Sequence, residues 1–156
     1  MKSNAVLSKD RKYRYVLSRI WDETEPMVMF IGLNPSTADE AKDDPTLRRC
    51  INYAKMWGYG GIYMLNLFAF RATKPKDMLH TEEPIGDEND KYLLEYSSIS
   101  DKIICAWGDN GSYKDRSSEI RMKFKNLDCL ALNKSGEPSH PLYLKKDLTP
   151  KKLLKV

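Results

Sequence analysis

The stretch MVMFIGLNPST, residues 27–37, decides what kind of fold to expect from this chain. Residues 27–33 form an apolar run without polar alternation, which is typical of a strand covered on both faces of a parallel sheet. The run ends at Asn34 and Pro35, a pair of residues that marks a sharp turn. A buried strand that runs into a polar turn is the repeating unit of α/β proteins, so we expect the rest of the chain to repeat it.

Three further apolar runs resemble the first, at residues 61–68, 102–107 and 128–132. Segments with helical signals lie between the runs, at residues 44–57, 87–98 and 114–125. The first of these segments has Asp43 or Asp44 as a cap, Pro45 in its first turn and Gly58 at its end. This alternation predicts a three-layer α/β/α sandwich with a four-stranded, mainly parallel sheet. Residues 11–19 fit either an outlying strand or a short helix.

The composition is that of a globular protein, because 41% of the residues are hydrophobic and 31% are charged. A length of 156 residues predicts a single domain, with residues 1–25 as an N-terminal extension and residues 145–156 as a basic C-terminal tail. The sequence contains neither a secretory signal nor an apolar run of about 20 residues. We therefore expect a cytoplasmic, monomeric protein without membrane contact.

Cysteine and histidine spacing argues against a metal site. The chain has three widely separated cysteines, which fit neither a disulfide framework nor a zinc site, and its two histidines are far apart. The common Gly-rich phosphate loops do not occur. The sequence therefore predicts no metal and no cofactor. The net charge of +4 permits a phosphate-bearing partner without requiring one.

Ligands of open parallel sheets bind outside the carboxyl ends of the strands, so the residues that follow each run are candidates for a site. Asn34 follows the first run, Asn66 lies near the end of the second, and His140 lies in a loop after the fourth. Each residue also has an ordinary explanation, as part of an Asn-Pro turn, as an amide satisfied by the backbone, or as a surface histidine. Together they predict one site at this edge of the sheet.

Short motifs spread along most of the chain resemble a family of uncharacterised bacterial and phage proteins known as DUF1643. The motifs are GLNPSTAD at 32–39, DPT at 44–46, WGYGG at 57–61, NLFA at 66–69, AWG at 106–108 and HPLYL at 140–144. The pattern is long and specific. By itself it implies no activity.

Four of these motifs also resemble the uracil-DNA glycosylase superfamily, and the resemblance implies that fold for this chain. It gives Asn34 the place of a residue that positions a water, Asn66 that of a residue that reads a flipped base, and His140 that of a residue that stabilises the leaving base. It also equates Trp107 with a tryptophan that ends the third strand, and Leu144 with a residue inserted into the duplex.

These residue types suit hydrolysis of an N-glycosidic bond, which builds positive charge on the sugar and negative charge on the departing base. A hydrogen bond from His140 would stabilise that anion, and the amide of Asn66 can both donate and accept at a base edge. Asn34 can orient a water but cannot take its proton, so we expect slow turnover. Asn34 and His140 are therefore the catalytic candidates. The candidates for substrate binding are Asn66, Pro35, Ser36, Thr37, Phe68, Arg71, Trp107, Ser139 and Leu144.

The sequence departs from the glycosylase pattern in ways that bear on the substrate. No Tyr-His follows Pro35, so the gate that excludes thymine in the strict uracil branch is missing. The small serine-rich loop expected after His-Pro is missing as well. A cluster without a glycosylase counterpart opens the first helical segment and offers possible phosphate-binding residues: Asp44, Thr46, Arg48 and Arg49.

The leading hypothesis for function is a metal-free DNA base glycosylase that acts on a deaminated or modified base flipped from single- or double-stranded DNA. The first alternative is an enzyme or sensor for a free nucleotide or nucleoside, with Arg48, Arg49 and Arg71 binding phosphate. The second alternative is a catalytically inactive DNA-binding module on the same fold, which would bind DNA in a salt-dependent way and leave its bases intact.

Overall fold

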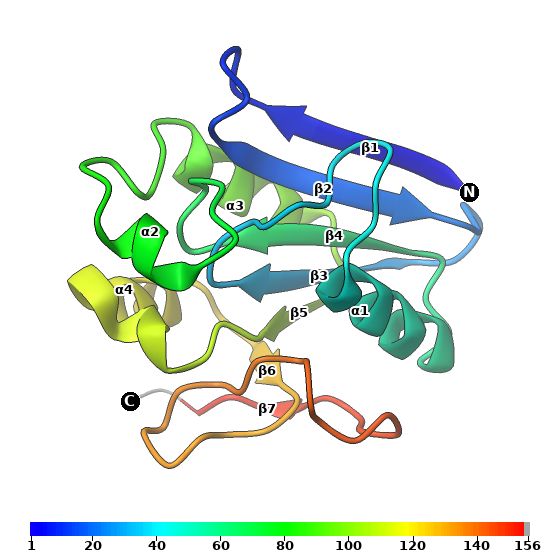
Figure 1. Cartoon of the computed structure of the whole chain (residues 1–156). Helices are drawn as coiled ribbons and strands as arrows, with labels where there is room; N and C mark the ends of the chain where they lie inside the picture. Colours follow the sequence, from blue (N-terminus) through cyan, green and yellow to red (C-terminus); the bar gives the residue numbers. More distant parts are fainter. Residues whose placement is uncertain (155–156) are drawn as a thin grey trace.

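The computed structural model describes residues 1–154 of the chain as an α/β fold built on one mixed sheet. The strands are β1 (Lys2–Leu7), β2 (Arg14–Ile20), β3 (Met27–Gly32), β4 (Gly61–Asn66), β5 (Lys102–Cys105), β6 (Leu127–Cys129) and β7 (Lys151–Lys152). The helices are α1 (Pro45–Met56), α2 (Pro75–Leu79), α3 (Asn89–Ser98) and α4 (Arg116–Lys123), and a 3-10 helix (Asp109–Asp115) precedes α4. The strand order is β1-β2-β4-β3-β5-β6-β7 (Figure 1).

The centre of the sheet is parallel, as the sequence predicts, but the sheet is larger than expected. Strands β4, β3, β5 and β6 run parallel to one another. Strand β2 pairs antiparallel with β4, β1 pairs antiparallel with β2, and β7 pairs antiparallel with β6. The prediction of a four-stranded sheet is therefore wrong. The described part of the chain adds a hairpin at one edge and a short strand at the other, and neither shows the unbroken apolar pattern of the buried central strands.

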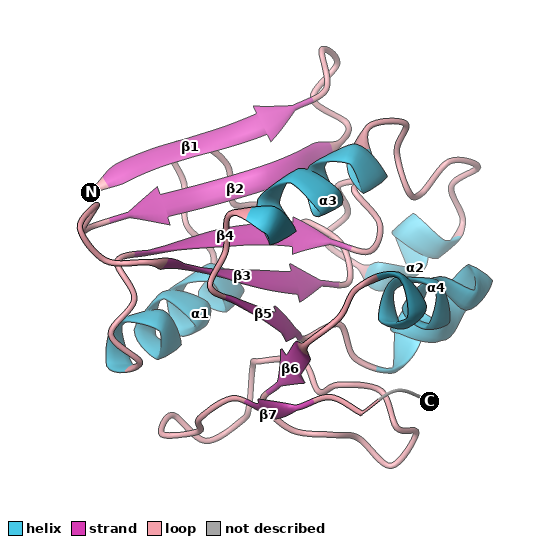
Figure 2. Ribbon diagram, turned by 180° about the vertical axis from the view of Figure 1, so that it is seen from behind, coloured by secondary structure: helices cyan, strands magenta, loops and turns pink. Residues whose placement is uncertain are grey.

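Helices cover both faces of the sheet, as Figures 1 and 2 show from opposite sides. Along β3 the side chains alternate between the two faces: Val28 and Phe30 belong to the core that includes α1, whereas Met29 and Ile31 belong to the core that includes α3 and α4. Both faces of this strand are buried, which explains why residues 27–33 show no polar alternation.

The N-terminal segment is an integral part of the sheet. Residues 1–25, expected as an extension, contain the β1–β2 hairpin, which is drawn in blue in Figure 1. Tyr15, Val16 and Leu17 of β2 are almost fully buried. Because β2 is antiparallel to the central strands, its first residue, Arg14, lies at the edge where β3 and β4 end.

The C-terminal segment is also held against the folded body. The indole of Trp57 donates a hydrogen bond to the carbonyl of Leu148 at 2.9 Å, and the hydroxyl of Tyr53 donates to the carbonyl of Lys145. The chain then forms β7 beside β6. Lys155, which belongs to the expected basic tail, lies outside the described residues. Within residues 1–154, no helix combines the length and apolar character that a membrane span requires.

Candidate functional site

A cavity of about 440 Å³ opens beside the carboxyl ends of β3 and β4, the edge at which the sequence predicts a site. This volume falls within the roughly 300–1,000 Å³ of typical small-ligand pockets. Asn34, Asn66 and His140 all line the cavity. Residues from β2, β3 and the loop after it, the start of α1, β4 and the loop after it, the start of α2 and the loop after β6 complete the lining: Arg14, Leu17, Gly32, Leu33, Ser36, Thr37, Asp44, Pro45, Thr46, Leu47, Met64, Ala72, Thr73, Pro75 and Leu142.

Asn34 ties together two of the loops that surround the cavity. Its Nδ2 donates hydrogen bonds to the carbonyls of Pro35 and Ala72, at 3.0 and 2.9 Å. The backbone N–H of Ala72 donates to the carbonyl of Pro35 as well. Among residues 1–154 the Oδ1 of Asn34 has no hydrogen-bond partner, and it is not an enclosed atom. Asn34 therefore offers the cavity a hydrogen-bond acceptor.

Asn66, the last residue of β4, is oriented by an arginine. Its Oδ1 accepts a long hydrogen bond of 3.4 Å from Nη2 of Arg14. A guanidinium can only donate, so the oxygen of this amide must face Arg14 and the Nδ2 must point elsewhere. A Cβ at Gly32 would lie 2.9 Å from that Nδ2, so the absence of a side chain at Gly32 makes room for the amide. Asn66 therefore offers a donor.

Arg14 is a buried cation in the wall of the cavity. Its exposed fraction is 3%, its Nη1 donates to the carbonyl of Ala38 at 2.9 Å, and its Nε has no partner among the described residues. Burial lowers the pKa of Arg14 to about 10, and the negative charge of Asp44 partly opposes this shift. The guanidinium is therefore still charged at neutral pH, although no carboxylate of residues 1–154 forms an ion pair with it.

The N-cap and first turn of helix α1 line the same cavity. Asp44 is the N-cap: its Oδ1 accepts from the N–H of Leu47 at 2.8 Å, and its Oδ2 accepts from the N–H of Ala38 at 3.4 Å. Pro45 occupies the first helical position, where a missing N–H costs nothing. The N–H of Thr46 is one of the donors that a helix leaves free at its start, and the helix dipole adds positive potential there.

His140 is an exposed residue of the cavity lining, and one of its ring nitrogens is already occupied. The backbone N–H of Leu142 donates to Nδ1 at 3.2 Å, so the proton of the neutral ring is on Nε2. The surrounding protein displaces water from the ring and lowers the pKa of His140 below its usual value, while the charge of Asp44 partly offsets this. At neutral pH His140 is therefore a neutral imidazole that offers an Nε2–H donor.

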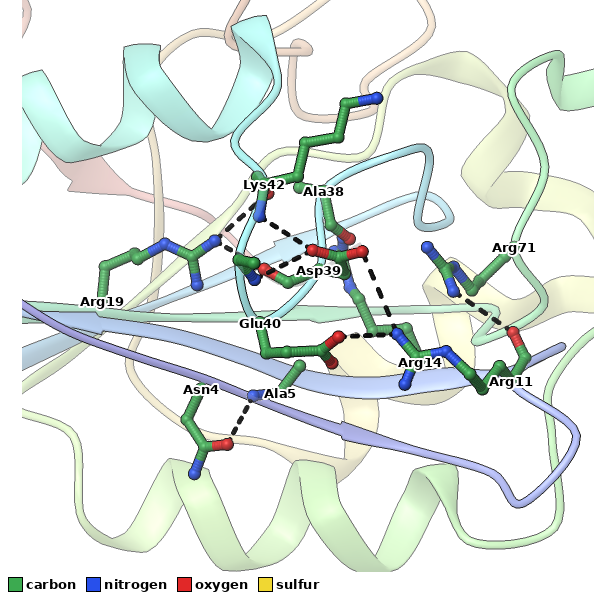
Figure 3. Close-up of polar contacts among 11 residues, drawn as sticks. Asn4, Ala5, Arg11, Arg14, Arg19, Ala38, Asp39, Glu40, Lys42 and Arg71 are labelled. Carbon is green, nitrogen blue, oxygen red and sulfur yellow. Dashed lines mark hydrogen bonds and ion pairs between the residues drawn. The ribbon is translucent and has the colours of Figure 1, made fainter.

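The loop between β3 and α1 is fastened by arginines of the N-terminal hairpin, as Figure 3 shows. Arg19 is 1% exposed, and its Nη2 donates to the carbonyls of Asp39 and Lys42 at 2.6 and 3.2 Å. Arg11 pairs with Glu40 at 2.7 Å. The hairpin therefore holds the loop that carries the polar wall of the cavity.

Several residues predicted to bind substrate lie outside the cavity lining and have structural partners. Phe68 is fully buried in the core, and Pro35 is buried in the loop after β3. Trp107 is 1% exposed and donates from its indole to Oε1 of Glu137 at 3.0 Å. Ser139 donates to Oδ1 of Asn133 at 2.6 Å. Trp107 and Ser139 thus hold the loop that presents His140, and neither lines the cavity itself.

Only some of the predicted phosphate-binding residues line the cavity. Thr46 and Asp44 line the cavity, whereas the side chains of Arg48 and Arg49 do not. Arg49 donates to the carbonyl of Leu144 at 2.9 Å, and the half-buried Leu144 side chain packs against the core beneath α1. Arg71, also outside the lining, donates to the carbonyl of Arg11 at 3.3 Å.

Sequence reasoning missed Arg14, the residue that orients Asn66. The available signal was a lone arginine between two tyrosines in the segment that fitted either a strand or a helix. Only the antiparallel pairing of β2 with β4 brings this arginine to the edge where the central strands end. Leu142 was missed as well, because its role is played by its backbone N–H.

The fold and the cavity define a class of protein: a three-layer α/β domain with a small-ligand pocket of amides, hydroxyls, one imidazole and one buried guanidinium. No group of three His, Cys, Asp or Glu side chains within residues 1–154 is arranged to hold a metal ion. Residues 14–142 match the family described as a protein of unknown function, DUF1643, and the chain belongs to that family. Neither a curated protein nor a solved structure shows significant similarity to the chain.

Proposed function

We propose that this chain binds a nucleobase in the cavity and hydrolyses the N-glycosidic bond of a deaminated or modified base flipped from DNA. The observation that carries the proposal is the meeting of Asn34, Asn66 and His140 around one cavity of about 440 Å³. The chemistry of their free atoms supports it: Asn66 and His140 offer donors, whereas Asn34 offers an acceptor. Two donors suit the carbonyl oxygens of a deaminated base.

In the proposed reaction, a water held by Oδ1 of Asn34 attacks C1′ of the sugar. The C1′–N bond breaks, and its electron pair leaves with the base. A hydrogen bond from Nε2–H of His140 stabilises the negative charge on the base, and the base anion takes up the proton that the water loses. The products are a free base and an abasic sugar. No side chain in this scheme takes the proton from water, so turnover is expected to be slow.

The finer description of the fold belongs to the same proposal. We take the parallel strands β4, β3, β5 and β6 as the counterpart of the uracil-DNA glycosylase sheet, with the β1–β2 hairpin and β7 as additions at its edges. This correspondence rests on the motifs at Asn34, Asn66, Trp107 and His140. A shared fold does not by itself establish a shared reaction, so the proposal depends on the side chains of the cavity.

The alternative of a free-nucleotide enzyme has lost part of its support. Its proposed phosphate ligands included Arg48 and Arg49, which do not line the cavity, and Arg49 holds the C-terminal segment. Thr46 and the start of α1 remain as possible phosphate contacts. The glycosylase proposal uses more of the residues that line the cavity.

A single-turnover excision assay tests the proposal. Single- and double-stranded oligonucleotides carrying uracil, hypoxanthine, xanthine or 5-hydroxymethyluracil are incubated with excess protein, and hot alkali then cleaves at abasic sites. We expect excision of at least one base, and a loss of about 10²-fold or more in His140→Ala and Asn66→Ala. His80→Ala and Asn52→Ala are matched controls, because both residues are exposed and neither lines the cavity.

The other outcomes are equally informative. Equal rates in the cavity variants and in the controls would show that the cavity isn't the catalytic site. DNA binding without excision of any base would support the inactive DNA-binding module. Neither binding nor excision would direct the search to free nucleotides.

A further inference from the structure

The buried charge of Arg14 has no direct counter-ion in the described part of the chain. Its exposed fraction is 3%, its Nε has no hydrogen-bond partner among residues 1–154, and its bond to Asn66 is long at 3.4 Å. A buried cation is normally paired, because removing it from water without a partner is costly. The cavity therefore holds a positive charge that no residue in direct contact with it neutralises, as far as residues 1–154 are concerned.

Asp44 does not fill this role. Both of its oxygens accept hydrogen bonds from backbone N–H groups, those of Leu47 and Ala38. Arg14 binds the other side of Ala38, through the carbonyl. The carboxylate is thus engaged by the start of α1, where the helix dipole also stabilises it. The guanidinium is left beside Asn66, and both residues line the cavity.

We propose that the missing negative charge comes from the ligand, and that the base bound beside Asn66 is an acidic base, ionised on its ring or carrying a carboxylate. This inference rests on the proposed function and narrows its substrate class. The Nδ2 of Asn66 and the Nε2 of His140 donate to the oxygens of such a base. Arg14 supplies the charge that distinguishes an anionic base from a neutral one of the same size.

Calorimetric binding of free bases tests the inference without requiring any excision. The probes are uracil, which is neutral, 5-nitrouracil, whose ring ionises readily, and orotate, which carries a carboxylate. We expect the two anions to bind at least about ten-fold more tightly than uracil, since a hydrogen bond to a charged group contributes that much. Inorganic phosphate is included to detect a site for any oxyanion.

The variants are Arg14→Gln, Arg14→Lys and, as a control, the exposed Arg48→Gln. We expect Arg14→Gln to lose the preference for anions, so that the ratio of its affinities for the anions and for uracil falls to about one, and Arg14→Lys and Arg48→Gln to keep the preference. Thermal unfolding shows whether each variant is folded. If Arg14→Gln does not fold, the affinity of the wild-type protein for 5-nitrouracil as a function of pH still tests the inference. This affinity must increase as the ring of 5-nitrouracil ionises with rising pH. Orotate, ionised throughout, corrects for pH-dependent changes in the cavity itself, whose lining includes Asp44 and His140.

Three results would overturn the inference. Equal affinity for uracil and for the anions excludes a charge-selective site. Retention of the preference in folded Arg14→Gln excludes Arg14 as its cause. Binding of phosphate that depends on Arg14, without binding of any base, assigns the charge to a different ligand. Excision without a preference for anionic bases would support the proposed function and reject this inference alone. Preferential binding of anionic bases without excision would support this inference and reject the proposed excision reaction.

Discussion

Gly32 shows how one missing side chain shapes the candidate site. A Cβ at this position would lie 2.9 Å from Nδ2 of Asn66, closer than real Cβ contacts allow. We expect Gly32→Ala to push the amide away from Arg14, to cost about 1–3 kcal/mol of stability as other overpacked sites do, and to abolish base binding. Thermal unfolding and calorimetry with the free bases measure the two effects. Wild-type binding by Gly32→Ala would mean that Asn66 does not read the base.

The protonation state of His140 gives a second test at the level of one residue. Its pKa is lowered by partial burial, so the unfolded chain binds this proton more readily than the folded protein. Stability should therefore fall as the pH drops through the unfolded value near 6.5 towards the lower folded value. Activity should fall in the same window, because protonated Nδ1 can no longer accept from Leu142.

An NMR titration of the imidazole in a His80→Ala background, where one histidine remains, measures this pKa directly. The expected midpoint lies below 6.5. Asp44→Asn should lower it further, because the carboxylate of Asp44 raises it. A midpoint above 6.5 would contradict the neutral imidazole on which the proposed reaction depends.

Helix α1 links stability to the site through its cap. Asp44→Ala removes the side-chain bond to the N–H of Leu47, and loss of such a cap costs about 0.5–2 kcal/mol. In a chain of this size we expect the melting temperature to fall by roughly 2–4 °C for each kcal/mol. Asp44→Asn keeps a capping oxygen and should melt close to the wild type. Equal melting of all three proteins would mean that Asp44 does not cap the helix in solution.

The elements that the sequence predicted well are those whose signals are local. The run at residues 27–33 and the Asp-Pro start of α1 need only neighbouring residues to be recognised, and both are confirmed. The sequence of β2 fits a strand or a helix equally well, because its identity depends on pairing with β4 far along the chain. Strand β7 has two residues and no apolar pattern, so only its position beside β6 makes it a strand.

The difference between local and long-range signals also explains which site residues could be predicted from the sequence. Asn66 ends a central strand, Asn34 lies just after one, and His140 lies in the loop that follows β6, so the rule for parallel sheets places them at one edge. Trp107 follows such a strand too, but its ring turns into the core and binds Glu137. The direction of a side chain and the arrival of Arg14 from an antiparallel neighbour are properties of the assembled fold, which no single stretch of sequence contains.

At the scale of the whole molecule, the N-terminal hairpin joins the fold to the site, and two truncations separate its contributions. Strand β1 is an edge strand that is largely exposed in its first half. Deletion of residues 1–7 should therefore lower the melting temperature and leave a cooperative transition, since β2 still pairs with β4. Circular dichroism during heating measures both properties.

Deletion of residues 1–20 should have a different result. It removes the buried side chains Tyr15, Val16 and Leu17, each of which contributes about 1.5–3 kcal/mol, from a domain whose total stability is about 5–15 kcal/mol. It also removes Arg14 and Arg19, which hold the loop between β3 and α1. We expect no cooperative unfolding and no binding of free bases. A cooperative transition in this truncation would mean that residues 21–156 fold alone. In that case the hairpin would be an extension of the domain and would not belong to its core.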